Sequence, residues 1–200
     1  MLLVTAASAT WQIPDTLIYE GKEYSIFDDL LTPYFKKYPD RDPKDEDYNC
    51  SASWRGYRAV FEIKRGELVL KDIFTKPCSD SSPSALLTVI PDGKPLKIDW
   101  YSGIFVTLDG KNNEAPYSLE FLTGFDRYSF FEIENGKFST AKHFDNKGFH
   151  AFKKEQFEKY KKTAEFSNRI KEITDRGKTS AEDAEKSLEV WHVFSLKKFL

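Results

Sequence analysis

FEIKRGEL at residues 61–68 and FEIENGKF at residues 131–138 are the segments that decide the fold. Each is an apolar strand, a polar turn with glycine near its end, and a returning strand, which is the pattern of a β-hairpin. Each runs on to a second phenylalanine, so Phe61 and Phe74 have the same spacing as Phe131 and Phe144. The match predicts an antiparallel sheet built of hairpins. The match reflects either an old duplication or two hairpins that arrived independently at the same kind of turn. It does not indicate any chemistry.

Further strands and one short helix are predicted around these hairpins. Residues 16–26 indicate a first hairpin, and residues 28–38 indicate a short helix that Asp28 caps. Apolar and polar residues alternate from residue 57 to residue 63, which is typical of a strand with one buried face.

The composition changes after Gly148, where apolar residues recur at helical spacing among lysines and glutamates. The spacing predicts one helix over residues 151–175, which Gly177 ends. Residues 179–182 form a capping box for a second helix. We therefore expect an α+β fold, a twisted antiparallel sheet with C-terminal helices packed on it. Residues 1–148 would be the β-rich region and residues 149–200 the helical segment of a single domain.

Charge and hydropathy exclude some classes of partner. The chain has 200 residues, a net charge of -2 and 16% aromatic residues. A near-neutral chain is not drawn to nucleic acid, and no run approaches the roughly 20 apolar residues that span a bilayer. Ala7-Ser8-Ala9 has the form of a signal-peptidase site, but no basic segment precedes it. We expect a cytoplasmic protein that binds neither nucleic acid nor membrane.

The redox state of the two cysteines, Cys50 and Cys78, depends on the compartment in which the protein resides. They would pair in an exported protein and stay free thiols in a cytosol. Two cysteines do not make a metal site by themselves.

Three segments of the chain resemble a family of uncharacterised bacterial proteins. They are WRGYRAVFEI at residues 54–63, IPDTLIYEGKEY at residues 13–24 and DWYSG at residues 99–103, which together cover roughly residues 11–105. The resemblance implies a small soluble bacterial protein of accessory type, such as an immunity or antitoxin-like binder. It implies no catalytic residue, because no activity is established for the family.

Aromatic and charged residues gather beside a glycine at two places. Tryptophan, tyrosine and arginine dominate the energetics of protein interfaces. An acidic loop over residues 39–47 would also steer a basic partner to the molecule. The candidate binding residues are Trp54, Arg55, Tyr57, Asp99, Trp100, Tyr101, Asp42, Asp45, Glu46 and Asp47. A structural alternative is that Arg55 or Arg58 pairs with Asp99 and pins a corner of the sheet.

No familiar catalytic motif occurs, and we assign no catalytic residue, metal or cofactor. His143, Asp145 and His150 form an incomplete metal pattern, for which turn and surface histidines are the simpler explanation. Glu62 and Asp99 would be the carboxylates of a hydrolase if they faced each other across a cleft.

The sequence therefore favours a non-enzymatic binding protein, of the immunity type, that neutralises a basic toxin-like protein by direct contact. A hydrolase based on carboxylates or histidine is one alternative. A β module that encloses a small apolar ligand is the other, and an internal cavity would distinguish it. The sequence carries no signal of oligomeric state.

Overall fold

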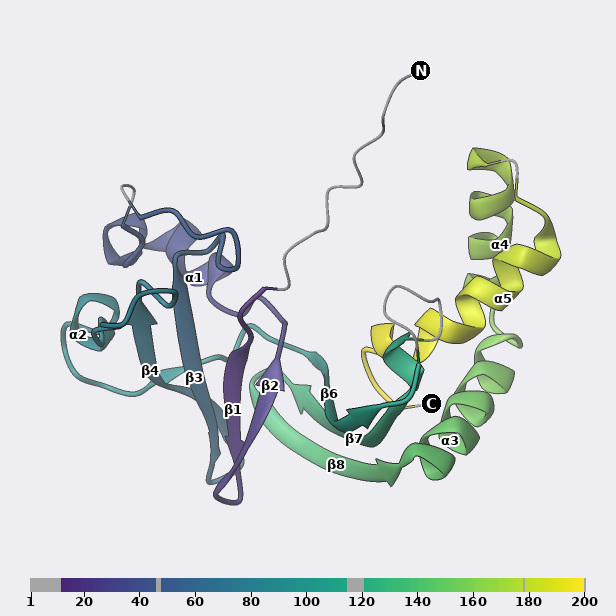
Figure 1. Ribbon diagram of the computed structural model, residues 1–200, viewed down its shortest axis with the longest axis horizontal. Coiled ribbons are helices and arrows are strands. Elements are labelled where there is room, and N and C mark those ends of the chain that lie inside the picture. The colour runs from purple at the N-terminus through teal and green to yellow at the C-terminus, as the bar shows by residue number, and fades with distance from the viewer. Residues whose placement is uncertain (1–11, 46–47, 115–120, 178, 200) are drawn as a thin grey trace. The chain divides into compact units, whose positions relative to one another are not determined.

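The computed structural model describes residues 12–45, 48–114, 121–177 and 179–199 (Figure 1). The chain divides into two compact units, Met1–Asp99 and Trp100–Leu200. The strands are mostly antiparallel and the longer helices follow them in the chain, which confirms the α+β class. The change from strands to helices falls after Asp145, close to the predicted position 148. That residues 1–148 and 149–200 belong to one domain stays a prediction.

The first unit is a five-stranded arrangement with short helical turns. Its elements are β1 (Asp15–Tyr19), β2 (Lys22–Ile26), α1 (Thr32–Lys37), the 3₁₀ turn η1 (Pro39–Arg41), β3 (Tyr57–Lys64), β4 (Glu67–Thr75), α2 (Leu86–Val89) and β5 (Leu96–Lys97). Four strands lie in the order β2-β1-β3-β4 (Figure 1), and β5 pairs with β4. Only the β1–β3 pair is parallel. Leu17, Ala59, Phe61 and Ile73 are fully buried and form the centre of its core.

Three hairpins share one turn chemistry, and it explains why their glycines are needed. The turns are Glu20-Gly21, Arg65-Gly66 and Asn135-Gly136, and all six residues have φ between 49° and 78°. Two successive residues in the left-handed region make a type I′ turn, whose twist matches the flanking strands. Glycine enters that region without the steric penalty of a Cβ atom.

The second unit is a three-stranded antiparallel sheet followed by helices. Its elements are β6 (Gly103–Asn112), the 3₁₀ turn η2 (Phe121–Thr123), β7 (Phe125–Glu134), β8 (Lys137–Asp145), α3 (Asn146–Tyr160), α4 (Ala164–Arg176), α5 (Ala181–Trp191) and the 3₁₀ turn η3 (His192–Ser195). The strands pair in the order β6-β7-β8.

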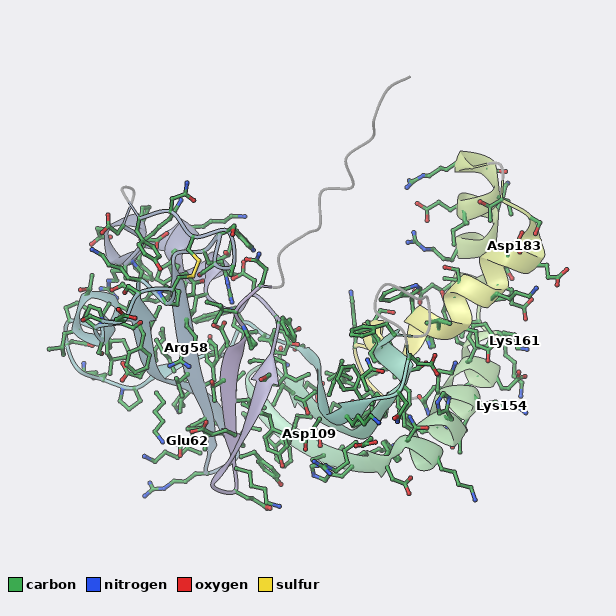
Figure 2. All side chains as sticks on the ribbon, in the orientation of Figure 1. Arg58, Glu62, Asp109, Lys154, Lys161 and Asp183 are labelled. Carbon is green, nitrogen blue, oxygen red and sulfur yellow. A yellow bond between two sulfur atoms is a disulfide. The ribbon has the colours of Figure 1, made fainter. Side chains whose placement is uncertain are left out.

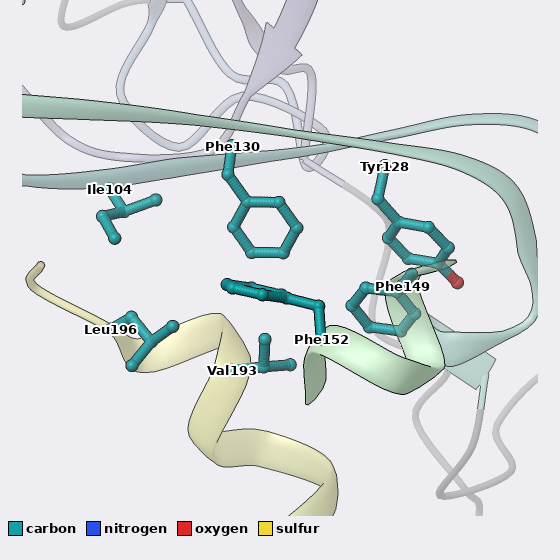
Figure 3. Packing of buried hydrophobic residues seen from close by; sticks show 7 residues of the cluster. All are labelled: Ile104, Tyr128, Phe130, Phe149, Phe152, Val193 and Leu196. Atoms are coloured by element: carbon teal, nitrogen blue, oxygen red, sulfur yellow. The ribbon is translucent and has the colours of Figure 1, made fainter. Parts of the chain in front are cut away.

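An aromatic cluster fills the space between this sheet and its helices. Figure 3 shows the Phe152 ring from α3 between Phe130 of β7 and Val193 of η3. Tyr128 and Phe149 stack with ring centroids 3.6 Å apart. Leu196 is also buried in this cluster, so the apolar residues that follow α5 pack against the sheet.

The two similar hairpins share their turn and one buried phenylalanine. β3–β4 and β7–β8 have the same turn, and Phe61 and Phe131 are both fully buried. The irregularity in strand pairing differs, between Val60 and Phe61 in one and between Glu132 and Ile133 in the other. The neighbouring strand differs too, since β1 is parallel to β3 whereas β6 is antiparallel to β7. The likeness is therefore limited to the hairpin.

Helix boundaries were predicted less well than strands. The predicted helix 28–38 is the six-residue α1, and Asp29, not Asp28, accepts hydrogen bonds from the backbone N–H and the hydroxyl of Thr32. The predicted single helix 151–175 is wrong. It is broken after Tyr160, because the Thr163 side chain accepts a hydrogen bond from Phe166 N and starts α4 as its N-cap.

Gly177 ends α4 as predicted, though with φ of -130° rather than in the left-handed region. The start of α5 lies one residue later than the predicted capping box. Ser180 accepts from the backbone N–H of Asp183, and its hydroxyl donates to the Asp183 carboxylate.

A disulfide joins Cys50 to Cys78, and its two sulfur atoms are drawn in yellow in Figure 2. It ties the segment before β3 to the segment after β4, across 28 positions of the chain. Among the described helices, none combines the length and the apolar character that crossing a membrane requires.

Candidate functional site

Trp54 stands on a tight turn that precedes β3. The backbone N–H of Gly56 donates to the carbonyl of Ser53 over 3.0 Å, which closes the turn, and Gly56 has φ of 74°. The Gln12 side chain holds the turn from outside, because its oxygen accepts from Trp54 N and its amide donates to the carbonyl of Ser51. These bonds fix the backbone while the indole remains 65% exposed. The turn therefore presents a large apolar side chain from a restrained support.

Arg55, the next residue, points inward and forms an ion pair with Asp15. Its Nη1 lies 2.7 Å from the Asp15 Oδ2, and the side chains are 10% and 1% exposed. The other oxygen of Asp15 accepts from the backbone N–H of Ala59 over 2.8 Å. β1 and β3 are parallel neighbours, so the start of β1 lies beside the start of β3, and this places Asp15 under the turn. The predicted pairing of Arg55 with Asp99 is replaced by this one.

Burial outweighs attraction in its effect on the pKa of Asp15, whereas attraction outweighs burial for Arg55. Burial raises the pKa of Asp15 to about 6, and the neighbouring Arg55 and the Ala59 N–H only partly offset the shift. Burial works to lower the pKa of Arg55, but attraction to Asp15 outweighs it and the net direction is upward. Arg55 thus stays charged, and Asp15 is ionised above about pH 6. The guanidinium also lies over the Tyr57 ring, 5.3 Å from its centroid.

A pocket of about 430 Å³ opens beside Trp54. We call it the Trp54 pocket. Its lining residues, from α1, η1, the segment before β3 and the first residue of β3, are Thr32, Phe35, Lys36, Pro39, Asp42, Lys44, Trp54, Arg55 and Tyr57. The rings of Phe35 and Tyr57 meet edge to face at 5.6 Å, and because both lining residues are buried we take them as the floor of the pocket. An aromatic floor with a charged rim is the composition of an interface hot spot.

The structure thus gathers four of the ten predicted binding residues, namely Trp54, Arg55, Tyr57 and Asp42. Asp45 forms an ion pair with Lys76 over 2.9 Å instead, which attaches the acidic loop to the segment after β4. Glu46 and Asp47 lie outside the described residues.

The predicted residues Asp99, Trp100 and Tyr101 lie where the two units meet along the chain. Asp99 is exposed, and Trp100 is 37% exposed. Tyr101 serves the second unit, where its ring stacks on Phe105 at 4.8 Å and its carbonyl accepts from Gly136 N. A binding role for these three residues stays a prediction.

The residues of the enzyme alternative have structural partners. The Glu62 carboxylate lies 3.8 Å from the Lys71 ammonium, and Figure 2 places Glu62 on β3. Nδ1 of His143 is 2.8 Å from the Ser129 hydroxyl, and the Asp145 side chain caps α3 by accepting from Gly148 N. No group of three or more metal-ligating side chains occurs among the residues that the structure describes.

Sequence reasoning missed Asp15, Phe35 and the two lysines Lys36 and Lys44. The only local signal for Asp15 is an acidic residue at the start of an apolar strand, where a carboxylate needs a partner if it is buried. Nothing in the sequence shows that α1 folds over the start of β3. The pocket therefore follows from long-range packing.

Comparison of the chain with models of protein families, with curated proteins and with solved structures finds no match. The resemblance to uncharacterised bacterial proteins therefore rests on the three quoted segments alone. The site has to be interpreted from its own geometry.

Proposed function

We propose that this chain is a non-enzymatic binding protein that recognises a protein partner through the Trp54 pocket. The observation that carries the proposal is the 65% exposure of Trp54 on a turn held by three hydrogen bonds, beside a pocket with an aromatic floor. Leaving an indole in water forgoes a large burial energy unless a partner covers it. A restrained turn also lowers the entropy lost on binding.

The partner that fits best is a basic protein of the toxin type, which the chain would neutralise by direct contact. Asp29, Asp40 and Asp42 are exposed on the segments around the pocket. These carboxylates would steer a basic surface toward Trp54. Lys36 and Lys44 line the pocket beside Asp42 and oppose this attraction, so the steering depends on the three carboxylates acting together.

The cytoplasm is the location expected from the sequence, but the Cys50–Cys78 disulfide favours an oxidising compartment. Alkylating free thiols in the native host before lysis distinguishes the cytoplasm from an oxidising compartment. Unmodified, paired cysteines in the recovered protein support export, and two alkylated cysteines support the cytoplasm.

A retention experiment with matched tryptophan variants tests the binding proposal. Wild type, Trp54→Ala and Trp191→Ala are immobilised and exposed to lysate of the native host, and Trp191 is a suitable control because it is 45% exposed in the other unit. We expect one protein to be retained by wild type and Trp191→Ala. Its affinity for Trp54→Ala should fall by about 30-fold, the effect of a hot spot near 2 kcal/mol.

The salt dependence of binding tests separately whether the partner is basic and whether it binds through the Trp54 pocket. A basic partner should bind less tightly as ionic strength rises. A partner that is lost with Trp54→Ala but insensitive to salt would support the pocket and contradict the basic-partner proposal. Equal retention of a specific protein by all three would contradict recognition through the Trp54 pocket, and retention of nothing specific would contradict the binding function itself.

A further inference from the structure

A groove separate from the Trp54 pocket lies elsewhere in the first unit. It has a volume of about 640 Å³ and is formed by the β3–β4 hairpin, the turn α2 and the segment before β5. We call it the α2 groove. Its lining residues are Glu62, Lys64, Arg65, Glu67, Val69, Leu70, Lys71, Leu86, Leu87, Ile90, Gly93, Lys94, Pro95 and Lys97.

The charges of the α2 groove are unbalanced. Both carboxylates already have internal partners, since Lys71 lies 3.8 Å from Glu62 and Lys97 lies 2.6 Å from Glu67. Lys64 and Arg65 are exposed and form no ion pair among the described residues. The groove thus presents an excess of cations to whatever enters it.

The floor of the α2 groove is apolar. Val69 and Ile90 are buried there, whereas Leu87 on the rim is 75% exposed, the largest exposed fraction among the large apolar side chains of the described residues. An apolar floor ringed by cations fits a ligand that is itself both apolar and anionic.

We propose that the α2 groove binds an acidic peptide segment that carries a leucine-like side chain. Glutamates or aspartates of the segment would pair with Lys64 and Arg65, and its apolar side chain would cover Leu87. Charge complementarity selects an acidic segment over a basic one. None of the lining residues is aromatic, so the groove lacks the stacking surfaces that single-stranded nucleic acids need.

This site is separate from the Trp54 pocket. Trp54 lies before the first residue of β3, whereas Lys64 is its last residue. Seven residue steps along a strand span roughly 23 Å. The two surfaces can therefore be disabled independently, and the proposal does not depend on the function assigned to Trp54.

The second hairpin supplies a matched variant for the test. Replacing Lys64-Arg65-Gly66 by the residues found at Glu134-Asn135-Gly136 gives Lys64→Glu/Arg65→Asn, which removes both cations. The turn is preserved, because Asn135 has the same left-handed φ (49°) as Arg65 (53°). Leu87→Ser is a second variant, outside the hairpin and at an exposed position.

The probe is a fluorescein-labelled peptide of glutamates around two central leucines, and binding is followed by fluorescence anisotropy. We expect wild type and Trp54→Ala to bind it with the same affinity. Lys64→Glu/Arg65→Asn should weaken binding by about tenfold or more, as should raising the salt from ~0.05 to ~0.2 M. Leu87→Ser should weaken binding by a similar factor, with an unchanged midpoint of thermal unfolding in each variant.

Control ligands decide what the groove prefers. Peptides with lysine for glutamate, or serine for leucine, should bind at least tenfold more weakly than the probe. The proposal is overturned if either control binds as well as the probe, or if the probe does not bind at ~1 mM. It is also overturned if a single-stranded oligonucleotide or vesicles of anionic lipid bind more tightly and lose affinity in Lys64→Glu/Arg65→Asn.

Discussion

Asp15 and Arg55 form an ion pair almost entirely removed from water, and Arg55 also lines the Trp54 pocket. Removing two charges from water costs several kcal/mol, and their attraction returns that energy only when geometry and hydrogen bonds are good. Here the carboxylate has two donors, Arg55 and the Ala59 N–H. The pair therefore does little for net stability while it fixes where the Trp54 turn lies.

The raised pKa of Asp15 predicts a pH dependence of stability. The pKa is about 6 in the folded state against an ordinary value of 3.8, so the folded state binds more protons between these values. The contribution of Asp15 is largest below about pH 4 and declines as the pH rises through about 6. The decline amounts to about 3 kcal/mol at most. Urea unfolding of wild type and Asp15→Asn at several pH values in this range measures the decline. If the free energy of unfolding varied with pH in the same way in both proteins, the prediction would be refuted.

His192 predicts a dependence of the opposite sign in the second unit. Its ring stacks on Tyr160 at 3.9 Å, and its buried Nε2 has no hydrogen-bond partner among the described residues. Burial lowers the pKa of His192, and Glu165 opposes this only in part. As the pH falls below 6.5 the unfolded state takes up a proton first, so stability decreases. His192→Phe keeps the stacked ring and should flatten this decrease, whereas an unchanged pH profile would argue against it.

At the scale of elements, the hairpins owe their register to the type I′ turns. A residue with a Cβ atom is strained in the left-handed region, because the Cβ atom clashes with the backbone carbonyl oxygen that follows. This strain would arise at the turn glycine of both copies of the repeated hairpin. We expect Gly66→Ala and Gly136→Ala each to lower the free energy of unfolding by about 1 kcal/mol. Gly177→Ala is the control, because φ there is -130°. Chemical denaturation measures all three, and equal effects at Gly66 and Gly177 would contradict this account of the turn.

At the scale of the whole molecule, the Cys50–Cys78 disulfide closes a long loop around β3 and β4. On the chain-entropy model a loop of this length stabilises the folded state by about 3–4 kcal/mol. We expect Cys50→Ser/Cys78→Ser to lose this amount. Because the two cysteines lie in the first unit, hydrogen exchange should rise in residues 12–99 and change little in the second unit.

Reduction provides the control for the disulfide prediction. A thiol reductant should destabilise wild type to the level of the double serine variant and leave that variant unchanged. Faster exchange throughout residues 100–199 would show that the two units do not unfold separately.

The parts of this molecule that could be predicted from the sequence are those set by near neighbours in the chain. The repeated FEI-x-x-G pattern led to both hairpins, because a glycine with left-handed φ and alternating apolar residues act within about ten positions. The helix break at Thr163 was missed although its signal is local. The apolar spacing continues across it, and one N-cap outweighs that continuity.

The tertiary structure alone decided the parallel pairing of β1 with β3, the ion pair of Arg55 with Asp15 rather than Asp99, and the two grooves of the first unit. Each joins residues that are far apart in the sequence. Trp54 and Tyr57 illustrate the reason, since they are similar aromatic residues three positions apart, yet one is 65% and the other 4% exposed. Hydrophobicity indicates that a side chain gains by burial, but only the packing of distant segments determines whether the protein itself or a partner covers it.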